Sequence, residues 1–266
     1  MSTKLASASS APAWESPTHL SDEMESTAAN RLTARIGAVL FLLALVVLVI
    51  STLLHPSHEN PMDNPAVFRE YAQSNIWIAV HLGQFVGFLL VIGGLVALYF
   101  SLTTRADTAA AVARFGLAAA VTTGASFTIL QAVDGIALKR AVDAWASAPP
   151  DQQVAAFAAA EAIRWIEIGV NSLSFSLVGL TLVLYGIALA LSGVYPRWLG
   201  WLAAAAGVAQ VVRGLDTSYQ GFITSITELV GLVLLALWTV IMAVTMWRRS
   251  NSPTVLSRKI ARPISG

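Results

Sequence analysis

Six long apolar runs constrain this chain more than any other feature of its sequence. They lie at residues 36–54, 78–102, 112–133, 166–191, 198–215 and 222–247. An α-helix needs about 20 mostly apolar residues to cross the hydrocarbon core of a bilayer, and each run approaches or exceeds that length. Because lipid cannot satisfy an exposed strand edge, helix is the expected state of every run. The sequence therefore predicts an all-α fold, a polytopic transmembrane helix bundle of about six spans.

Composition supports the same fold class. Hydrophobic residues make up 56% of the chain and charged residues only 12%, whereas about a quarter of the residues of a soluble domain are charged. So few charges cannot cover a water-facing surface, and the lipid bilayer is the expected partner. The net charge of +1 argues against a nucleic-acid partner, since neutralising a phosphate backbone takes a basic face. Cysteine is absent, which excludes disulfides and thiolate-ligated metals.

Two tails flank the runs. Residues 1–35 are rich in Ser, Ala and Thr and are predicted to form a disordered cytoplasmic tail. They do not resemble a signal peptide, because the first apolar run starts late and is too long. Residues 248–266 are predicted to form a basic cytoplasmic tail.

Two longer connections are expected on the outer side of the membrane. The first, 55–77, contains Asn64-Pro65, a typical helix start, which predicts a short interfacial helix reaching residue 74. The second, 134–165, is predicted to be a helical hairpin broken at Pro149-Pro150.

Orientation follows from the distribution of basic residues, because cytoplasmic segments carry an excess of Lys and Arg. If the N-terminus is cytoplasmic, few of the 16 Lys and Arg residues fall on the outer side, namely Arg69, Lys139, Arg140, Arg164 and Arg213. We therefore expect both termini in the cytoplasm.

Glycines recur on single helix faces. Gly83 and Gly87 are four residues apart in the second run, and Gly200, Gly207 and Gly214 are seven apart in the fifth. Such spacing favours the close approach of a neighbouring helix. These residues predict packing, and they carry no functional information.

Polar residues within the spans gather toward the ends that this orientation places outside. Arg164, Glu167 and Asn171 are at i, i+3 and i+7, on one helical face. Gln220, Thr224 and Glu228 are at i, i+4 and i+8, which would also form one face. The whole candidate set is His81, Gln84, Gln131, Asp134, Arg164, Glu167, Asn171, Gln210, Arg213, Asp216, Gln220 and Glu228.

Two interpretations of this set compete. A charge facing lipid costs about 2.5–3.5 kcal/mol at mid-helix, so all these faces are expected to turn inward. The first interpretation is structural: Arg164 pairs with Glu167, and Arg213 pairs with Asp216 or Glu228. The second is functional: the faces line an outward-facing polar pocket that binds a small solute, a proton or a cation.

Metal and cofactor chemistry finds less support in the sequence. His81 is the one histidine inside the predicted bundle, and with Asp134, Glu167 or Glu228 it could form a mixed nitrogen and oxygen site. His55, His58 and Glu59 are predicted to lie in a solvated loop, since neighbouring prolines disrupt a helical zinc motif. The sequence has no phosphate-binding loop and no dinucleotide fingerprint, so no cofactor is expected.

Two stretches carry a resemblance to known proteins. Residues 131–139, taken with 162–167, form the first, and the turn Tyr195-Pro196-Arg197-Trp198 after Gly186 forms the second. Together they resemble uncharacterised bacterial integral membrane proteins with six spans, a family defined by a domain of unknown function. The resemblance implies a bundle over residues 36–247 in a bacterial plasma membrane. It implies no catalytic or binding residue.

The leading functional hypothesis is a non-enzymatic multi-pass membrane protein whose outward-facing polar pocket binds or passes a small solute or ion. One alternative is a membrane-embedded metal-dependent enzyme that uses His81 and nearby carboxylates. A second alternative is a structural subunit that packs against a protein partner through the 134–165 hairpin. No sequence feature assigns an oligomeric state.

Overall fold

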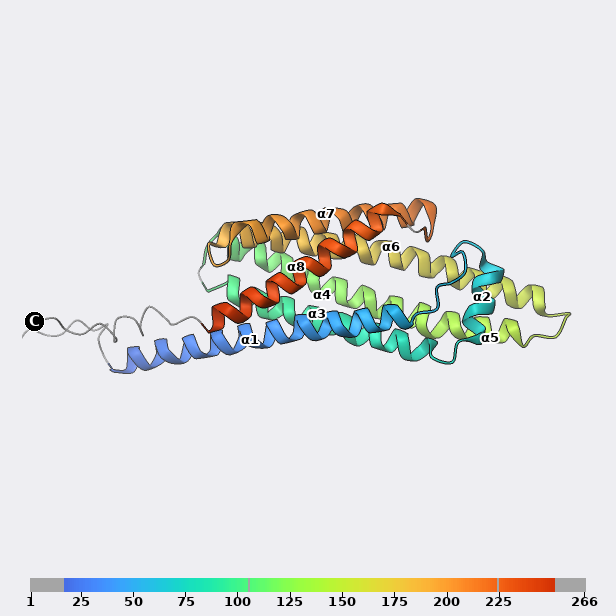
Figure 1. The fold of residues 1–266 in the computed structure, drawn as a ribbon, viewed down its shortest axis with the longest axis horizontal. Helices are drawn as coiled ribbons and strands as arrows, with labels where there is room; N and C mark the ends of the chain where they lie inside the picture. The colour runs from blue at the N-terminus through green and yellow to red at the C-terminus, as the bar shows by residue number, and fades with distance from the viewer. Residues whose placement is uncertain (1–16, 105, 224, 252–266) are drawn as a thin grey trace, which may run out of the picture.

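The computed structural model describes residues 17–104, 106–223 and 225–251 (Figure 1). Within these ranges, 6 helices are long and apolar enough to cross a membrane. They are α1 (Pro17–Leu54), α3 (Trp77–Leu102), α4 (Thr108–Gln131), α6 (Gln153–Ser192), α7 (Arg197–Gln220) and α8 (Ile226–Ser250). The predicted all-α bundle with six spans is confirmed.

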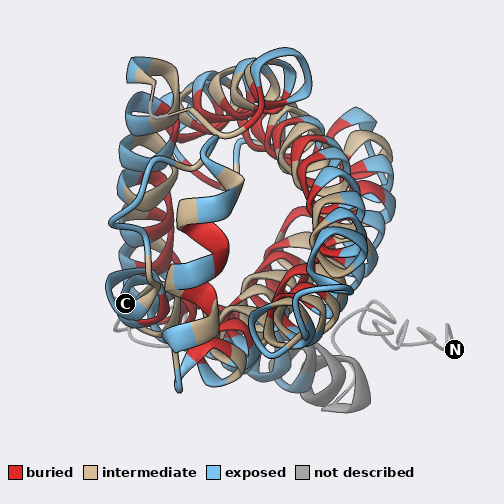
Figure 2. Cartoon of the chain, turned by 90° about the vertical axis from the view of Figure 1, so that its right-hand side faces the viewer, coloured by how far each residue is buried: buried red, intermediate tan, exposed pale blue. Residues whose placement is uncertain are grey.

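The six long helices form a closed ring. Contacts between the helices give the order α1, α3, α4, α6, α7 and α8, and α8 packs back against α1. Figure 2 shows the ring seen from one end. Each helix packs on its two neighbours, while helices that are not neighbours in the ring, such as α3 and α6, make few contacts. Side chains that point inward from different helices therefore share the interior of one ring.

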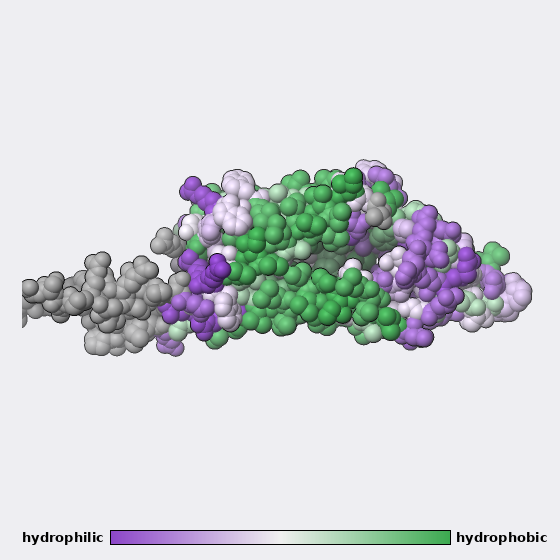
Figure 3. Space-filling model, viewed as in Figure 1, coloured by the Kyte–Doolittle hydropathy of each residue, from purple (hydrophilic) through white to green (hydrophobic). Residues whose placement is uncertain are grey.

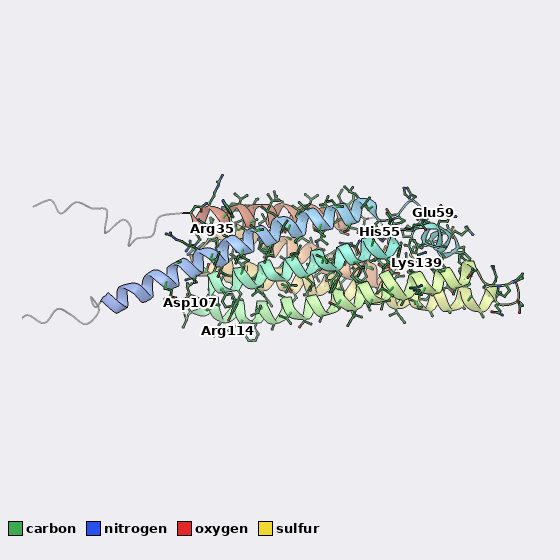
Figure 4. All side chains as sticks on the ribbon, turned by 90° about the horizontal axis from the view of Figure 1, so that it is seen from below. Arg35, His55, Glu59, Asp107, Arg114 and Lys139 are labelled. Atoms are coloured by element: carbon green, nitrogen blue, oxygen red, sulfur yellow. The ribbon has the colours of Figure 1, made fainter. Side chains whose placement is uncertain are left out.

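The two ends of the ring differ. We name the end of the ring at which α8 finishes the terminal end. The opposite end, which α2 (Asn64–Gln73) crosses, is named the α2 end (Figure 1). Figure 3 shows a broad apolar band between two hydrophilic ends. Figure 4 places Arg35, Asp107 and Arg114 near the terminal end and His55, Glu59 and Lys139 at the α2 end. This distribution is typical of a chain that spans a bilayer.

Apolar side chains fill the terminal half of the ring. Phe41 and Trp238 meet edge to face at 5.8 Å between ring centroids, and Met242 and Met246 are fully buried beside them. Tyr185 is also fully buried, and its hydroxyl donates to the Leu95 carbonyl at 2.9 Å. The α1–α8 contact closes this half of the ring.

The first helix starts earlier than the sequence suggested. α1 begins at Pro17, so residues 17–35 are helical, whereas a disordered tail was predicted over 1–35. The segment from Thr18 to Arg35 contains neither Pro nor Gly, and its Ala, Glu, Leu and Arg residues favour helix, so the turns of the span continue back through it. Residues 1–16 and most of the predicted basic tail, 252–266, lie outside the described residues.

Both predicted outer connections contain the expected helices. In α2, the carboxylate of the N-cap residue Asp63 accepts from the Ala66 N–H, and Val67, Phe68 and Tyr71 are buried. The second connection continues α4 into η2 (Ala132–Leu138), a π-helical segment, and α5 (Lys139–Ala146), then turns at Pro149-Pro150 into α6. Phe68 packs on Trp145 and Phe157, which fixes α2 to the hairpin.

The expected face containing Gln220, Thr224 and Glu228 does not exist. Gln220 is the last residue of α7, the chain turns at Gly221 with φ 75°, and α8 starts at Ile226. The physical reason is an N-cap: the Ser225 hydroxyl accepts from the Glu228 N–H at 3.1 Å. The pattern Ser-x-x-Glu, a capping box sequence, could have shown this start. Thr224 lies outside the described residues.

Glycines allow α6 and α7 to pack very closely, as predicted. A Cβ built on Gly207 would lie 2.6 Å from the Gly179 carbonyl oxygen, and one built on Gly186 would lie 2.6 Å from the Gly200 carbonyl oxygen. On the other side of the ring, Gly87 receives the Leu48 side chain of α1. Close packing of α6 on α7 fixes the positions of the polar residues that both helices carry.

Candidate functional site

His81 lies in the second turn of α3, facing the interior of the ring at the α2 end. It is 2% exposed. Its Nδ1 lies 2.8 Å from the Trp77 carbonyl oxygen, which can only accept, so Nδ1 carries a proton. The other ring nitrogen, Nε2, lies 3.1 Å from Oδ2 of Asp134. Among the described residues, none makes a hydrogen bond of normal geometry with Nε2.

Asp134 reaches His81 because the chain is π-helical there. The residue belongs to η2, which follows α4 directly, and it is 9% exposed. Gly135 lies against the His81 Cβ, so only a glycine allows this approach. The Trp77 indole N–H donates to the Asp134 carbonyl at 3.2 Å, which ties α3 to η2. Asp134 Oδ1 is buried without a hydrogen-bond partner among the described residues.

His55 joins the same group, although the sequence placed it in a solvated loop. It follows the last residue of α1 and is half-buried; its ring centroid lies 4.9 Å from that of Trp77 and 5.1 Å from that of His81. Burial lowers the pKa of His55 below its ordinary value, against the opposing effect of the Asp134 carboxylate. Potential ligand atoms of His55, His81 and Asp134 all lie within 4.8 Å of one another.

The sequence contained one signal for His55. His55 directly follows the apolar run 36–54. Its depth in the membrane therefore matches that of a residue near the start of the next, antiparallel span, where His81 lies. His58 and Glu59 are exposed, as expected for a solvated loop, and His58 contacts Glu70 at 2.8 Å.

Arg164 and Glu167 form a buried ion pair beside this group. Arg164 Nη1 donates to both carboxylate oxygens of Glu167, at 2.9 and 2.8 Å, and the two side chains are 3% and 4% exposed. The Arg164 guanidinium also reaches the Tyr71 hydroxyl at 3.4 Å and the Pro61 carbonyl at 3.2 Å. Burial raises the pKa of Tyr71 well above its ordinary value, with the Arg164 charge acting against the shift.

A second polar group lies where α7 meets α8. Arg213 Nη2 donates to Glu228 at 2.7 Å, and its guanidinium lies 3.6 Å from the ring centroid of Phe175 on α6. Asp216 accepts instead from the Thr227 hydroxyl at 2.7 Å. Of the two partners expected for Arg213, the structure selects Glu228. The link to the first group is Phe222, whose ring lies 4.6 Å from the Arg164 guanidinium.

The uncharged candidates differ in burial. Gln131 and Gln210 are buried, and Gln131 Oε1 and both amide atoms of Gln210 lack hydrogen-bond partners among the described residues. Gln84 and Asn171 are half-buried. Gln220 is exposed and belongs to a shallow groove of about 490 Å³ outside the ring, between α6 and the end of α7. The structure therefore does not bring Gln220 to the other candidates.

The arrangement combines acids, a histidine pair and two arginines at one end of a ring whose remaining buried residues are mostly apolar. Several of their buried polar atoms remain unpaired by the described residues: Gln131 Oε1, Asp134 Oδ1, His81 Nε2, Arg164 Nε, Arg213 Nη1 and the Gln210 amide. Each unpaired buried polar group costs about 1–3 kcal/mol. Both hydrogen-bond donors and acceptors are present, so the site can satisfy a small polar or charged ligand.

Comparison with known proteins assigns a family and no activity. No curated protein and no solved structure matches the chain. Residues 36–226 match the family described as a domain of unknown function, DUF4386. The match covers the first five spans, both long connections and the start of α8, including His55, His81, Asp134, Arg164 and Glu167. The chain therefore belongs to the DUF4386 family of multi-pass membrane proteins of unknown function, as the resemblance in its sequence indicated.

Proposed function

We propose that this protein binds a small polar solute or ion in a polar chamber inside the ring at the α2 end, and that this end faces the exterior of a bacterial plasma membrane. We define the chamber by His81, Asp134, Arg164, Glu167 and Arg213. The carrying observation is the set of buried polar atoms there that no described residue satisfies. Since each costs free energy when unpaired, a ligand that pairs with them would be favoured.

The distribution of charge supports a binding site more than a purely structural network. Arg164–Glu167 and Arg213–Glu228 are complete ion pairs, and they account for the structural interpretation. His81 and Asp134 are left over, since neither is needed to neutralise an arginine. Burying polar residues that make no needed ion pair costs free energy in the interior of a membrane protein. Their presence therefore suggests a functional site.

Binding from the α2 end is better supported than passage through the ring. The terminal half is filled by Phe41, Tyr185, Trp238, Met242 and Met246, all nearly or fully buried. Such a close-packed and mainly apolar core offers a polar solute few hydrogen-bond partners along its path. The protein in this conformation is therefore proposed to bind its ligand and release it on the same side.

The alternative of a structural subunit receives less support. An interaction surface on the hairpin would need exposed apolar side chains. Trp145 and Phe157 of the hairpin instead pack against Phe68 of α2 within the same chain. These two aromatic residues therefore already have an intramolecular partner, whereas Val154 and Trp165 of the hairpin are exposed.

A thermal-shift screen of purified protein against small ions and polar metabolites tests the proposal. A ligand that binds only the folded state stabilises it by about 2.7 kcal/mol at a concentration one hundred times its Kd. We expect such a ligand to raise the unfolding temperature of wild type and to shift Glu167→Gln and Arg213→Gln much less. Each shift is measured against the same variant without ligand, so that any intrinsic loss of stability cancels.

Asp143→Asn is the matched control. Asp143 is a carboxylate at the same end, but its side chain is 43% exposed and pairs with Lys139 of its own helix, α5. This variant should keep the full ligand-dependent shift. If no compound shifts wild type, or if Glu167→Gln and Arg213→Gln respond as wild type does, the ion pairs are structural and the chamber is not a binding site.

A further inference from the structure

We propose that His55, His81 and Asp134 form a binding site for a divalent transition-metal ion of the Zn²⁺ class. The site lies at the α2 end, beside the Arg164–Glu167 pair. The inference rests on the proposed function, because it names the class of ligand that the chamber takes. The three ligands come from the end of α1, from α3 and from η2, so the metal would join three separate segments of the chain.

The distances suit a small ion. In a tetrahedral zinc site with metal–ligand bonds of about 2.0–2.2 Å, two ligand atoms lie about 3.3–3.6 Å apart. His81 Nε2 and Asp134 Oδ2 are 3.1 Å apart, close to that spacing before any adjustment. The ligand atom of His55 lies within 4.8 Å of both. His55 is half-buried at the beginning of a loop, so its ring can close the remaining gap by rotation.

The protonation of His81 favours a cation at this point. Because Nδ1 donates its proton to the Trp77 carbonyl, the neutral ring presents a lone pair at Nε2. That lone pair faces an oxygen of Asp134. Two acceptors at such a distance repel each other unless a proton or a metal ion lies between them, and a metal ion can in addition bind His55. Donation from the second ring nitrogen to a backbone carbonyl is also the usual outer contact of a metal-bound histidine.

Asp134 is the carboxylate left free to bind a metal. Glu167 is occupied by Arg164, and Glu228 is occupied by Arg213. In the part of the chain that the structure describes, no Lys or Arg nitrogen lies within 4 Å of Asp134, whose one ion-pair contact is His81. A divalent ion would therefore neutralise a buried carboxylate whose one close ion-pair partner among the described residues, His81, is cationic only when protonated.

The donor set selects the class of metal. Two imidazole nitrogens and one carboxylate oxygen suit Zn²⁺, Co²⁺ and Ni²⁺, whereas Mg²⁺ and Ca²⁺ take mostly oxygen ligands. Three protein ligands also leave a fourth position for water or a bound solute, as in zinc sites that are not purely structural.

Figure 4 shows His55 at the end of α1, close to the start of α3, which places the site next to the loop that leads out of the bundle.

The test uses the full-length protein, purified in detergent and freed of metal with a chelator. Zn²⁺ binding is measured by titration calorimetry, and Co²⁺ is added separately because its visible absorption reports the geometry and the nitrogen ligands of the site. We expect one ion per chain in wild type. His81→Gln and Asp134→Asn should abolish binding, and His55→Gln should weaken it at least tenfold and change the Co²⁺ spectrum.

His58→Gln is the control, since His58 lies in the same loop but its side chain is 90% exposed. This variant should bind as wild type does. Far-UV circular dichroism of the metal-free variants checks folding. If His81→Gln or Asp134→Asn does not fold, His55→Gln still tests the proposal, because it changes a loop residue. Stoichiometric binding that survives His55→Gln unchanged, or that depends on His58, overturns the proposal.

The two proposals can fail separately. If Zn²⁺ and Co²⁺ do not bind but another solute gives a shift that Glu167→Gln removes, the metal site is wrong and the chamber stands. If neither a metal nor any solute binds, both are wrong.

Discussion

At the α2 end, Arg164 contacts residues of several different segments. Its guanidinium donates to Glu167 on its own helix, to the Pro61 carbonyl in the α1–α2 loop and to the Tyr71 hydroxyl on α2. The ring of Phe222, from the α7–α8 connection, covers it at 4.6 Å. One side chain therefore links α6 to the α1–α2 loop, to α2 and to the α7–α8 connection, and it forms an ion pair with a single carboxylate.

Removing that carboxylate should be costly. Breaking a buried ion pair by deleting one partner typically costs about 3–5 kcal/mol, because the remaining charge stays buried. We expect Glu167→Gln to lower the free energy of unfolding by roughly this amount, measured by denaturation in detergent. The double variant Arg164→Met with Glu167→Leu should recover much of the loss, since it leaves no uncompensated charge. A double variant less stable than Glu167→Gln would contradict this account.

Glu70 holds the loop between α1 and α2, and this contact depends on pH. Burial would raise the pKa of Glu70, but hydrogen bonds from the His58 N–H, the His58 ring and the Glu59 N–H together lower it below its ordinary value. A lowered pKa contributes stability that is present above the ordinary glutamate value of about 4.3 and is lost as the pH falls through the lowered pKa. The loop should therefore loosen in acid.

Hydrogen exchange of the 57–62 amides, compared at neutral pH and below pH 4, measures this effect. Protection should fall in acid for wild type, after correction for the intrinsic exchange rate. In Glu70→Gln it should be low at both pH values, because the amide cannot replace a charged acceptor. Protection that is the same in both proteins at neutral pH would show that Glu70 does not hold the loop.

At the scale of elements, the α6–α7 pair is the most closely packed part of the ring. Gly179 lies against the Gly207 carbonyl oxygen and Gly186 against the Gly200 carbonyl oxygen, so the two backbones touch at both positions. Without a hydrophobic driving force in lipid, such packing is a main source of helix association. The pair also fixes the distance between Arg164 on α6 and Arg213 on α7.

Two glycine substitutions separate packing from helix propensity. Gly207→Ala places a Cβ 2.6 Å from the Gly179 carbonyl oxygen and should cost about 1–3 kcal/mol through overpacking. Gly169→Ala, on α6, meets nothing within 4 Å and should gain up to about 1 kcal/mol from helix propensity. The free energies of unfolding of the two variants and of wild type are measured in the same detergent and compared. Equal effects of the two substitutions would show that the close approach contributes nothing.

η2 decides where Asp134 points. An α-helix has a fixed rotation per residue, and the π-helical segment Ala132–Leu138 changes that rotation within the extension of α4. π-Helical segments are rare and frequently occur at functional sites. Here the segment brings Asp134 to His81 and places Gly135 against the His81 side chain, so one local irregularity creates the central contact of the site.

At the scale of the whole molecule, the ring has one apolar half and one polar end. Figure 3 shows the apolar band between hydrophilic ends, and the polar residues of the interior lie toward the end that α2 covers. α1 and α8 meet near the terminal end, through contacts such as Phe41 with Trp238 and Arg35 with Asn251. A binding site at one end of a bundle whose other half is packed can respond to solutes on one side of the membrane.

Cysteine labelling in intact bacteria tests the orientation. The chain has no cysteine, so single substitutions give an unambiguous signal. Gln152→Cys, in the exposed hairpin turn, should react with a membrane-impermeant maleimide from outside, because the excess of Lys and Arg near the other end favours a cytoplasmic terminal end. Ala106→Cys, in the exposed α3–α4 loop, should react only after permeabilisation. The reverse pattern would place the proposed chamber on the cytoplasmic side.

Local features of the sequence determined most of the architecture. The six spans follow from run length and hydropathy, since hydrocarbon thickness sets helix length independently of the fold. The short helix after Asn64-Pro65 and the hairpin at Pro149-Pro150 follow from backbone preferences of a few residues. The Arg164–Glu167 pair follows from i, i+3 spacing on one helix. None of these depends on how the helices pack against one another.

The tertiary structure alone decided which residues meet between segments. It brought His55 from the end of α1 onto His81, chose Glu228 over Asp216 as the partner of Arg213, and left Gln220 outside the ring. The physical reason is that contacts between helices depend on the rotation, depth and crossing of each helix, which are set jointly by all its neighbours. Periodicity shows that a side chain shares a face with others of its own helix, and only packing shows what that face meets.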